Sequence, residues 1–179
     1  MNNTSKEVTY LQDRNGIKYE VNQEKPFTGK YVKYETKWFK YVVKMKEVNF
    51  VDGKKEGICT EWYKNGQKKS EVTYNNGELD GFCIEWYKNG QKKSEIHYKD
   101  GEYEGLCLEW YKNGQKEFEG NYKNGENEGL WTVWSENGHK LYERNYKNGV
   151  EDGLWIWWDE EGNVTATATY KDGKLVKQN

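Results

Sequence analysis

The chain is short of the residues on which most enzyme and membrane sites are built. It has two histidines, three cysteines and one proline in 179 residues, and arginine occurs only at Arg14 and Arg144. Hydrophobic residues make up 34% of the chain, and no apolar run approaches the roughly 20 residues of a membrane-spanning helix. Nucleophile–base spacings, metal-ligand clusters and phosphate-binding glycine loops are also missing. We therefore expect a protein that is not an enzyme and that holds neither cofactor nor metal.

The charge balance excludes further classes of partner. The formal net charge is −2, so the chain has no general attraction for nucleic acid or for an anionic membrane. We expect no nucleic-acid partner, and a membrane partner is disfavoured. Residues 1–7 contain no apolar signal region. The sequence as given favours the cytoplasm, but an extracytoplasmic location stays open if a signal peptide was trimmed, so the compartment is left unassigned.

What the chain does contain is a repeat of 24 residues. Glycine, tryptophan and tyrosine each return five times at this step, and a fixed period of this kind is typical of stacked repeat proteins. Such stacks usually present extended surfaces to partners. The three columns are Gly57, Gly81, Gly105, Gly129 and Gly153; Trp62, Trp86, Trp110, Trp134 and Trp158; and Tyr74, Tyr98, Tyr122, Tyr146 and Tyr170.

Each repeat reads as two short strands joined by tight turns. Asn-Gly or Asp-Gly between alternating apolar residues is a strong hairpin signal, and it occurs twice per repeat, as at Asn113-Gly114 and Asn124-Gly125. We predict an all-β fold: an elongated, single-sheet antiparallel meander of stacked 24-residue β-hairpin repeats. Three-residue loops at both ends of each repeat would pair Trp110 with Lys116, and would place Trp110, Phe118 and Tyr122 on one face.

The period also sets the expected domain organisation. Residues 1–179 are predicted to form a single repeat domain, with a cap hairpin over about 1–28 and a degenerate long repeat over 29–56. Five full repeats follow at 57–80, 81–104, 105–128, 129–152 and 153–176. Cys59, Cys83 and Cys107 share one repeat position, so neighbours lie two strands, or about 9.5 Å, apart. A disulfide needs Cα atoms within about 7 Å, so we expect none.

The second face of the sheet changes character along the chain. The cysteine column becomes Trp131 and Trp155, the column of Glu61 becomes Val133 and Trp157, and Leu141 replaces a lysine opposite Val133. Two interpretations stay open. The cluster is either local packing at one end of the sheet or a partner-binding patch, since exposed apolar clusters mark interaction sites.

A second candidate surface lies in the irregular N-terminal part. Four extra residues around Glu35–Tyr41 predict a longer hairpin with Trp38 and Phe39 near its tip, where large aromatic residues are candidate contacts. Folding back onto the sheet is the alternative. The candidate partner-binding residues are therefore Trp131, Val133, Leu141, Trp155, Trp157, Trp38 and Phe39.

Several of these segments resemble a known family. Glu-Trp-Tyr-Lys-Asn-Gly-Gln-Lys-Lys-Ser-Glu at 61–71 and 85–95, Gly-Leu-Trp at 129–131 and 153–155, and Lys-Pro-Phe-Thr-Gly at 25–29 are similar to the bacterial MORN-repeat variant. One branch of that family comprises YwqK-type antitoxins. The resemblance implies a β-hairpin scaffold for association with proteins or membranes, without catalytic residues.

Two functions from different classes follow. The first is a non-catalytic protein-binding repeat scaffold, for example an antitoxin or immunity protein that sequesters a toxin. The alternative is a secreted or surface-exposed module for glycan or cell-wall binding or adhesion, because stacked aromatic rings suit sugar rings. A homodimer through one face of the sheet is also open, since a one-layer sheet leaves an aromatic face uncovered.

Overall fold

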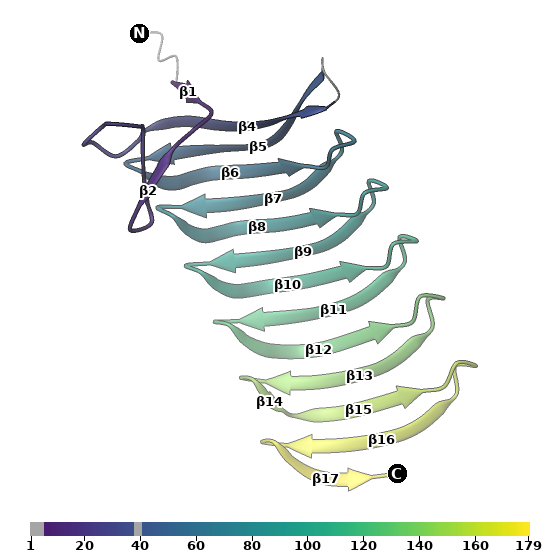
Figure 1. Ribbon diagram of the computed structural model, residues 1–179. Helices are drawn as coiled ribbons and strands as arrows, with labels where there is room; N and C mark the ends of the chain where they lie inside the picture. The colour runs from purple at the N-terminus through teal and green to yellow at the C-terminus, as the bar shows by residue number, and fades with distance from the viewer. Residues whose placement is uncertain (1–5, 38–40) are drawn as a thin grey trace. The chain divides into compact units, whose positions relative to one another are not determined.

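The fold is built of β-strands. The computed structural model describes residues 6–37 and 41–179, and all regular elements in them are strands (Figure 1). None of these residues forms a helix that could span a membrane. The chain divides into two compact units, unit 1 (Met1–Gly90) and unit 2 (Gln91–Asn179), which are described in turn.

Unit 1 contains an antiparallel meander and a small N-terminal cap. In the meander each strand pairs with the next along the chain. A short first strand pairs in parallel with β4, and two further strands form a separate hairpin. The strands are β1 (Glu7–Val8), β2 (Gln12–Arg14), β3 (Ile17–Tyr19), β4 (Gly29–Lys37), β5 (Tyr41–Val51), β6 (Lys54–Trp62), β7 (Lys68–Asn75) and β8 (Glu78–Trp86).

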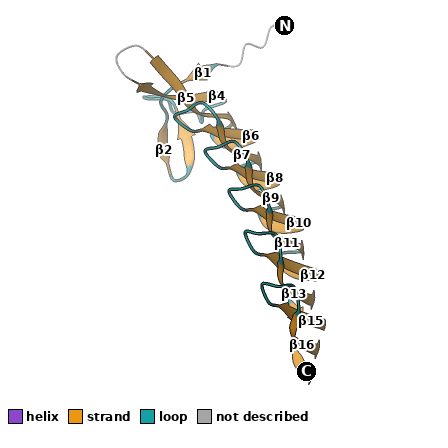
Figure 2. Cartoon of the chain, turned by 90° about the vertical axis from the view of Figure 1, so that its right-hand side faces the viewer, coloured by secondary structure: helices purple, strands orange, loops and turns teal. Residues whose placement is uncertain are grey.

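Unit 2 continues the same hairpin pattern in one layer, which Figure 2 shows from the side. Its strands are β9 (Lys92–Lys99), β10 (Glu102–Trp110), β11 (Lys116–Lys123), β12 (Glu126–Trp134), β13 (Lys140–Lys147), β14 (Val150–Glu151), β15 (Gly153–Trp158), β16 (Val164–Lys171) and β17 (Lys174–Gln178). The predicted all-β class and the antiparallel meander of 24-residue hairpins are confirmed. The three cysteines are free thiols, as their spacing predicted.

The loop inside each repeat has the predicted three-residue form. In the first full repeat, the Tyr63 amide donates to the Gln67 carbonyl at 2.8 Å, and the Gly66 amide donates to the Tyr63 carbonyl at 2.9 Å. Gly66 has a φ of 90°, a left-handed value that glycine adopts without steric cost. The predicted pairing of Trp110 with Lys116 is confirmed.

The turn between repeats differs from the prediction. Asn75 pairs directly with Glu78, which leaves a loop of two residues, Asn76 and Gly77. Their φ angles are 50° and 93°, and positive φ at both positions is the mark of a type I′ turn. The prediction of three-residue loops at both ends is therefore wrong here. The type I′ turn matches the right-handed twist of the flanking strands, and Asn-Gly is the pair best suited to it.

A bulge beside each tryptophan decides which residues share a face. Glu109 pairs with Phe118, but the next residue, Trp110, pairs with Lys116, so Glu117 is the extra residue of a β-bulge. An extra residue interrupts the alternation of side chains along a strand. Phe118 and Tyr122 therefore share the face of Cys107 and Glu109, not that of Trp110. The predicted grouping of Trp110, Phe118 and Tyr122 on one face is wrong for this reason.

The two faces are named here by their repeated aromatic residues. The tyrosine face carries Tyr74, Tyr98, Tyr122, Tyr146 and Tyr170, and the tryptophan face carries Trp62, Trp86, Trp110, Trp134 and Trp158. On the tryptophan face a lysine of one repeat lies over the indole of the next. Lys68 Nζ is 5.6 Å from the Trp86 ring centroid, and Lys116 Nζ is 5.3 Å from that of Trp134.

The same lysines are held in place by carboxylates three residues later. Lys116 Nζ donates to Glu119 at 2.5 Å, and Lys140 Nζ donates to Glu143 at 2.5 Å. Exposed cation–π contacts are worth about 0.5–1 kcal/mol each, and exposed ion pairs about 0–1 kcal/mol. Each contact is weak, but a lysine of the preceding repeat lies over each of the five column tryptophans, and these contacts tie consecutive repeats together.

A buried hydrophobic cluster of unit 1 lies between the cap and the tyrosine face. Phe27 packs against Phe50 with ring centroids 6.1 Å apart, and Val48 and Cys59 complete the cluster. All four are at most 5% exposed. Phe27 comes from the segment between β3 and β4, so the cap supplies a second layer over the first strands of the sheet.

The column glycines are required by backbone geometry, as Gly105 illustrates. Its φ is 77°, it lies at the register shift between Tyr103 and Cys107, and a Cβ placed there would meet nothing within 4 Å. We predict that Gly105→Ala lowers the free energy of unfolding by about 1 kcal/mol, because an L-residue strains in the left-handed region. Gly105→Asn should lose less, since asparagine tolerates this region. Urea unfolding measures both, and equal losses would contradict the explanation.

Candidate functional site

The tyrosine face of unit 2 carries a continuous row of aromatic rings, called here the aromatic ladder. Neighbouring ring centroids lie 4.5–5.7 Å apart, the range in which aromatic pairs attract beyond their buried area. The ladder runs through Tyr98, Tyr103, Tyr122, Trp131, Tyr146, Trp155 and Tyr170.

Most residues of the predicted patch meet at this ladder. Trp131 and Val133 come from β12, and Trp155 and Trp157 come from β15, with the rings of the last two 5.9 Å apart. Val133 pairs with Tyr142 rather than Leu141, because Leu141 is the extra residue of the bulge on β13. The predicted register of Leu141 is therefore off by one residue. Trp38 and Phe39 lie outside the described residues.

The two tryptophans of the ladder lie against the sheet and do not stand free. The Trp131 indole donates to the Asn121 carbonyl at 3.1 Å, and the Trp155 indole donates to the Asn145 carbonyl at 3.2 Å. Trp155 is only 7% exposed, whereas Trp131, Val133, Leu141 and Trp157 are half-buried. Local packing therefore accounts for Trp155, and the accessible part of the patch is formed by the other residues.

Arg144 lies at the centre of the patch and was missed from the sequence. Its guanidinium carbon is 4.3 Å from the Tyr142 ring centroid and 4.7 Å from that of Trp155. It makes no salt bridge with any described residue, and its buried Nε has no hydrogen-bond partner among them. A signal was present, because arginine occurs only twice in the chain and Arg144 takes a repeat position held by Val72 and Ile96.

A glycine makes room for the first ladder tryptophan. Gly120 pairs with Cys107 on the tyrosine face, and a Cβ at Gly120 would lie 2.9 Å from the Trp131 ring and 2.8 Å from Phe118. Trp131 takes the repeat position that Cys107 holds one repeat earlier, and its larger side chain fits because the neighbouring Gly120 has none. A hollow of about 330 Å³ opens next to this contact, lined by Phe118, Val133 and Tyr142 among others.

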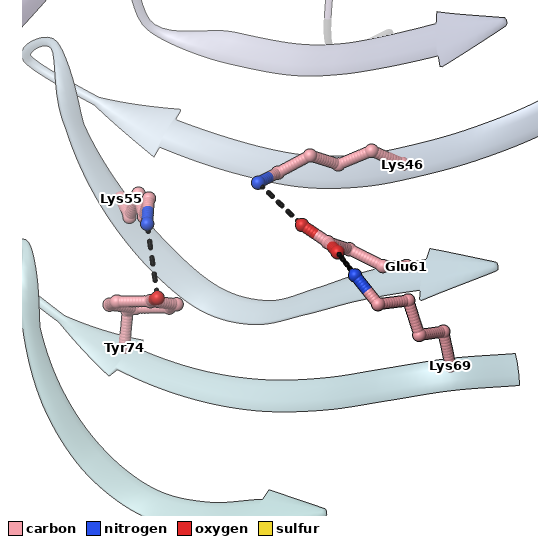
Figure 3. Close-up of polar contacts among 5 residues, drawn as sticks. All are labelled: Lys46, Lys55, Glu61, Lys69 and Tyr74. Atoms are coloured by element: carbon pink, nitrogen blue, oxygen red, sulfur yellow. Dashed lines mark hydrogen bonds and ion pairs between the residues drawn. The ribbon is translucent and has the colours of Figure 1, made fainter. Parts of the chain in front are cut away.

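The tyrosine face of unit 1 has different chemistry, because lysines line it. Glu61 accepts hydrogen bonds from Lys46 at 2.9 Å and Lys69 at 3.0 Å (Figure 3). Lys55 Nζ donates to the Tyr74 hydroxyl at 3.0 Å and lies 4.1 Å from that ring centroid. The polar second face that the sequence predicted for the early repeats is thus an ion-pair network.

The network shifts the pKa values of its members. Burial alone would raise the pKa of Glu61, but the hydrogen bonds from Lys46 and Lys69 outweigh it, and the pKa falls below its usual 4.5. Burial alone would lower the pKa of Lys46, yet the bond to Glu61 leaves it raised above 10.5. Both groups are therefore charged over the whole neutral range.

A double-mutant cycle tests the fit between Gly120 and Trp131. We predict that Gly120→Ala lowers the free energy of unfolding by about 1–3 kcal/mol, the usual cost of overpacking. In a Trp131→Cys background, which restores the residue found at Cys107, the same change should cost much less. Chemical denaturation of the four proteins gives the coupling energy, and additive effects would show that the ring does not press on Gly120.

The Glu61 network predicts acid sensitivity. Because the folded pKa of Glu61 lies below the unfolded value, its stabilisation is present above pH 4.5 and is lost as the pH falls through the folded pKa. Glu61→Gln should therefore lower the free energy of unfolding at pH 7 by less than about 1 kcal/mol, since the pair is solvent-screened, and the loss should be smaller at pH 3 than at pH 7. Glu160→Gln, at an exposed residue of unit 2, is the control. A constant offset at both pH values would contradict the prediction.

Comparison with known proteins agrees with the repeat geometry. The family model for the MORN repeat variant matches residues 55–76, 79–100, 103–124, 127–148 and 151–172, which together are more than half of the chain. Each match runs from two residues before a column glycine to two residues after a column tyrosine, and so covers one hairpin. The curated proteins that were searched contain no match. On its five matched repeats, the chain belongs to the MORN repeat variant family.

Proposed function

We propose that this protein is a non-catalytic scaffold that binds another protein through the patch around Arg144. Membership of the MORN repeat variant family makes the chain a repeat scaffold, and repeat scaffolds present extended surfaces to partners. The observation that carries the proposal is the arginine itself. It is a permanent cation, held between aromatic rings, with no carboxylate of the described chain beside it.

The surroundings of Arg144 have the chemistry of a binding hot spot. Tryptophan, tyrosine and arginine dominate the binding energy of protein interfaces, and here the rings of Tyr142 and Trp155 lie against the guanidinium. All strands of unit 2 belong to one layer, so no second layer of this unit lies over the face. A partner that brings a carboxylate and an apolar side chain would satisfy Arg144 and cover the half-buried rings.

The absence of catalysis is part of the proposal. The repeated carboxylates of the tryptophan face are ion-paired, as in Lys116–Glu119 and Lys140–Glu143. No group of three metal-ligating side chains occurs among residues 6–37 and 41–179. These features favour a structural role for the polar columns over a role in acid–base chemistry.

A more specific role follows from the family resemblance. We propose an antitoxin or immunity protein in which the patch sequesters a toxin, because such proteins act by covering a partner and need no chemistry of their own. The partner to try first is the product of the neighbouring gene. Growth rescue on co-expression with that product measures neutralisation directly.

The test combines that partner with variants of the patch. Arg144→Ala and Trp157→Ala should each weaken binding about tenfold or more, which corresponds to at least about 1.4 kcal/mol, as expected for hot-spot residues. Leu154→Ala is the matched control, because this leucine is 46% exposed on the opposite face and should change affinity less than twofold. Calorimetric titration measures the affinity, and circular dichroism checks the fold.

Three outcomes would contradict the proposal in different ways. Unchanged affinity in both patch variants would remove this face from the binding site. A loss confined to Leu154→Ala would move the site to the tryptophan face. Displacement of the partner by soluble glycans, or self-association that is abolished by Trp157→Ala, would favour the glycan-binding or homodimer alternative.

A further inference from the structure

Unit 1 contains two hollows that meet on its tyrosine face, and lysine is the commonest residue in the lining of both. Their volumes are about 710 Å³ and 420 Å³, and they share Lys33 and Lys46. Together they are lined by seven lysines and two glutamates, although the whole chain has a net charge of −2. We call this surface the lysine groove. Its lysines are Lys18, Lys33, Lys46, Lys55, Lys64, Lys69 and Lys88.

The positive charge of the groove is not neutralised from within. Glu61 is shared by Lys46 and Lys69, and Glu35 is bound by Lys64 at 2.9 Å. Lys33 makes no salt bridge with any described residue. It also lies directly opposite another cation, Lys46, on the neighbouring strand. Like charges in directly opposite positions of a sheet destabilise it.

Of the remaining lysines, Lys18 is ion-paired with Asp13 at 2.6 Å, whereas Lys55 and Lys88 have aromatic contacts in place of carboxylates. Lys88 Nζ lies 5.9 Å from the Tyr63 ring centroid, and Lys55 contacts the ring and hydroxyl of Tyr74. The seven lysines of the groove thus have only three carboxylates within the described chain as partners, those of Asp13, Glu35 and Glu61, and an anion bound there would balance the remaining positive charge.

The walls of the groove indicate which anion fits. Glu61 already shows a carboxylate bridged by two lysine ammonium groups on this surface (Figure 3). Met45, Trp62 and Tyr63 line the larger hollow, and Tyr31, Val48 and Phe50 line the smaller one. Such apolar walls suit the aliphatic stems of glutamate side chains better than a bare phosphate.

We propose that the lysine groove binds an acidic peptide segment of a partner protein, with its carboxylates placed between Lys33, Lys46 and Lys69. The inference rests on the proposed role as a protein-binding scaffold but concerns a surface separate from the Arg144 patch. Lys33 is the residue whose charge the segment would satisfy first, because it is exposed and forms no ion pair with any described residue.

The test uses the full chain and two fluorescein-labelled peptides, (Glu-Ser)5 and (Gln-Ser)5, measured by fluorescence anisotropy. The glutamate peptide should bind, more weakly as salt rises because the charges are screened, and the glutamine peptide should not. Lys33→Glu should weaken binding about fivefold or more, and Lys33→Gln should have a smaller effect. Lys123→Glu carries the same charge change at the exposed last residue of β11 in unit 2 and should leave binding within twofold.

Every other result overturns the proposal. Equal binding of both peptides would show that charge is not recognised. Equal losses of affinity for the glutamate peptide in Lys33→Glu and Lys123→Glu would show that only the net charge of the protein matters. Binding to phosphatidylserine vesicles or to inorganic phosphate without binding to the glutamate peptide would identify a membrane or phosphate site. Arg144→Ala separates the two proposals, because it should weaken the partner but leave the peptide unaffected.

Discussion

The one extra residue that each second strand carries opposite its tryptophan is the constraint on which the rest of the structure depends. Side chains alternate along a strand, so a single bulge transfers all later residues of that strand to the other face. The bulge at Glu117 brings Phe118 and Tyr122 beside Cys107 and Glu109. Without it the tyrosines would join the tryptophans, neither the aromatic ladder nor the lysine groove would exist, and Arg144 would have no rings to lie against.

The two faces that result have separate tasks. The tryptophan face joins repeats, because each lysine lies over the indole of the following repeat and is held there by its own glutamate. The side chains of the tyrosine face can differ from repeat to repeat while the strands, the turns and the contacts of the tryptophan face stay the same. In unit 1 it carries lysines around Glu61, and in unit 2 it carries rings around Arg144. The same backbone thus displays two chemistries, which is what a binding scaffold requires.

The strands, the positions of the turns and their order could be predicted from the sequence, because short-range sequence signals determine them. Asn-Gly pairs and the fixed step of 24 residues determine strands, turns and their order, and the pairing of Trp110 with Lys116 follows from the loop length. Counting alternate positions along each strand could not predict which residues share a face. The bulge forms only where two strands pair, and no characteristic residue type marks it at Glu117. The patch at Trp131 and Trp157 was visible as a change within a column. Arg144 was overlooked because its role depends on rings from neighbouring strands.

The lysine–indole contacts also give the array a direction. Lys92 lies over Trp110 and Lys116 lies over Trp134, so each of these lysines covers an indole of the repeat after its own. Removing a hairpin from the C-terminal side leaves all remaining indoles covered. Removing one from the N-terminal side bares a tryptophan. Hairpins can therefore be gained or lost at one end of the array more easily than at the other, and gene duplications that change the repeat number should accumulate at the C-terminal end.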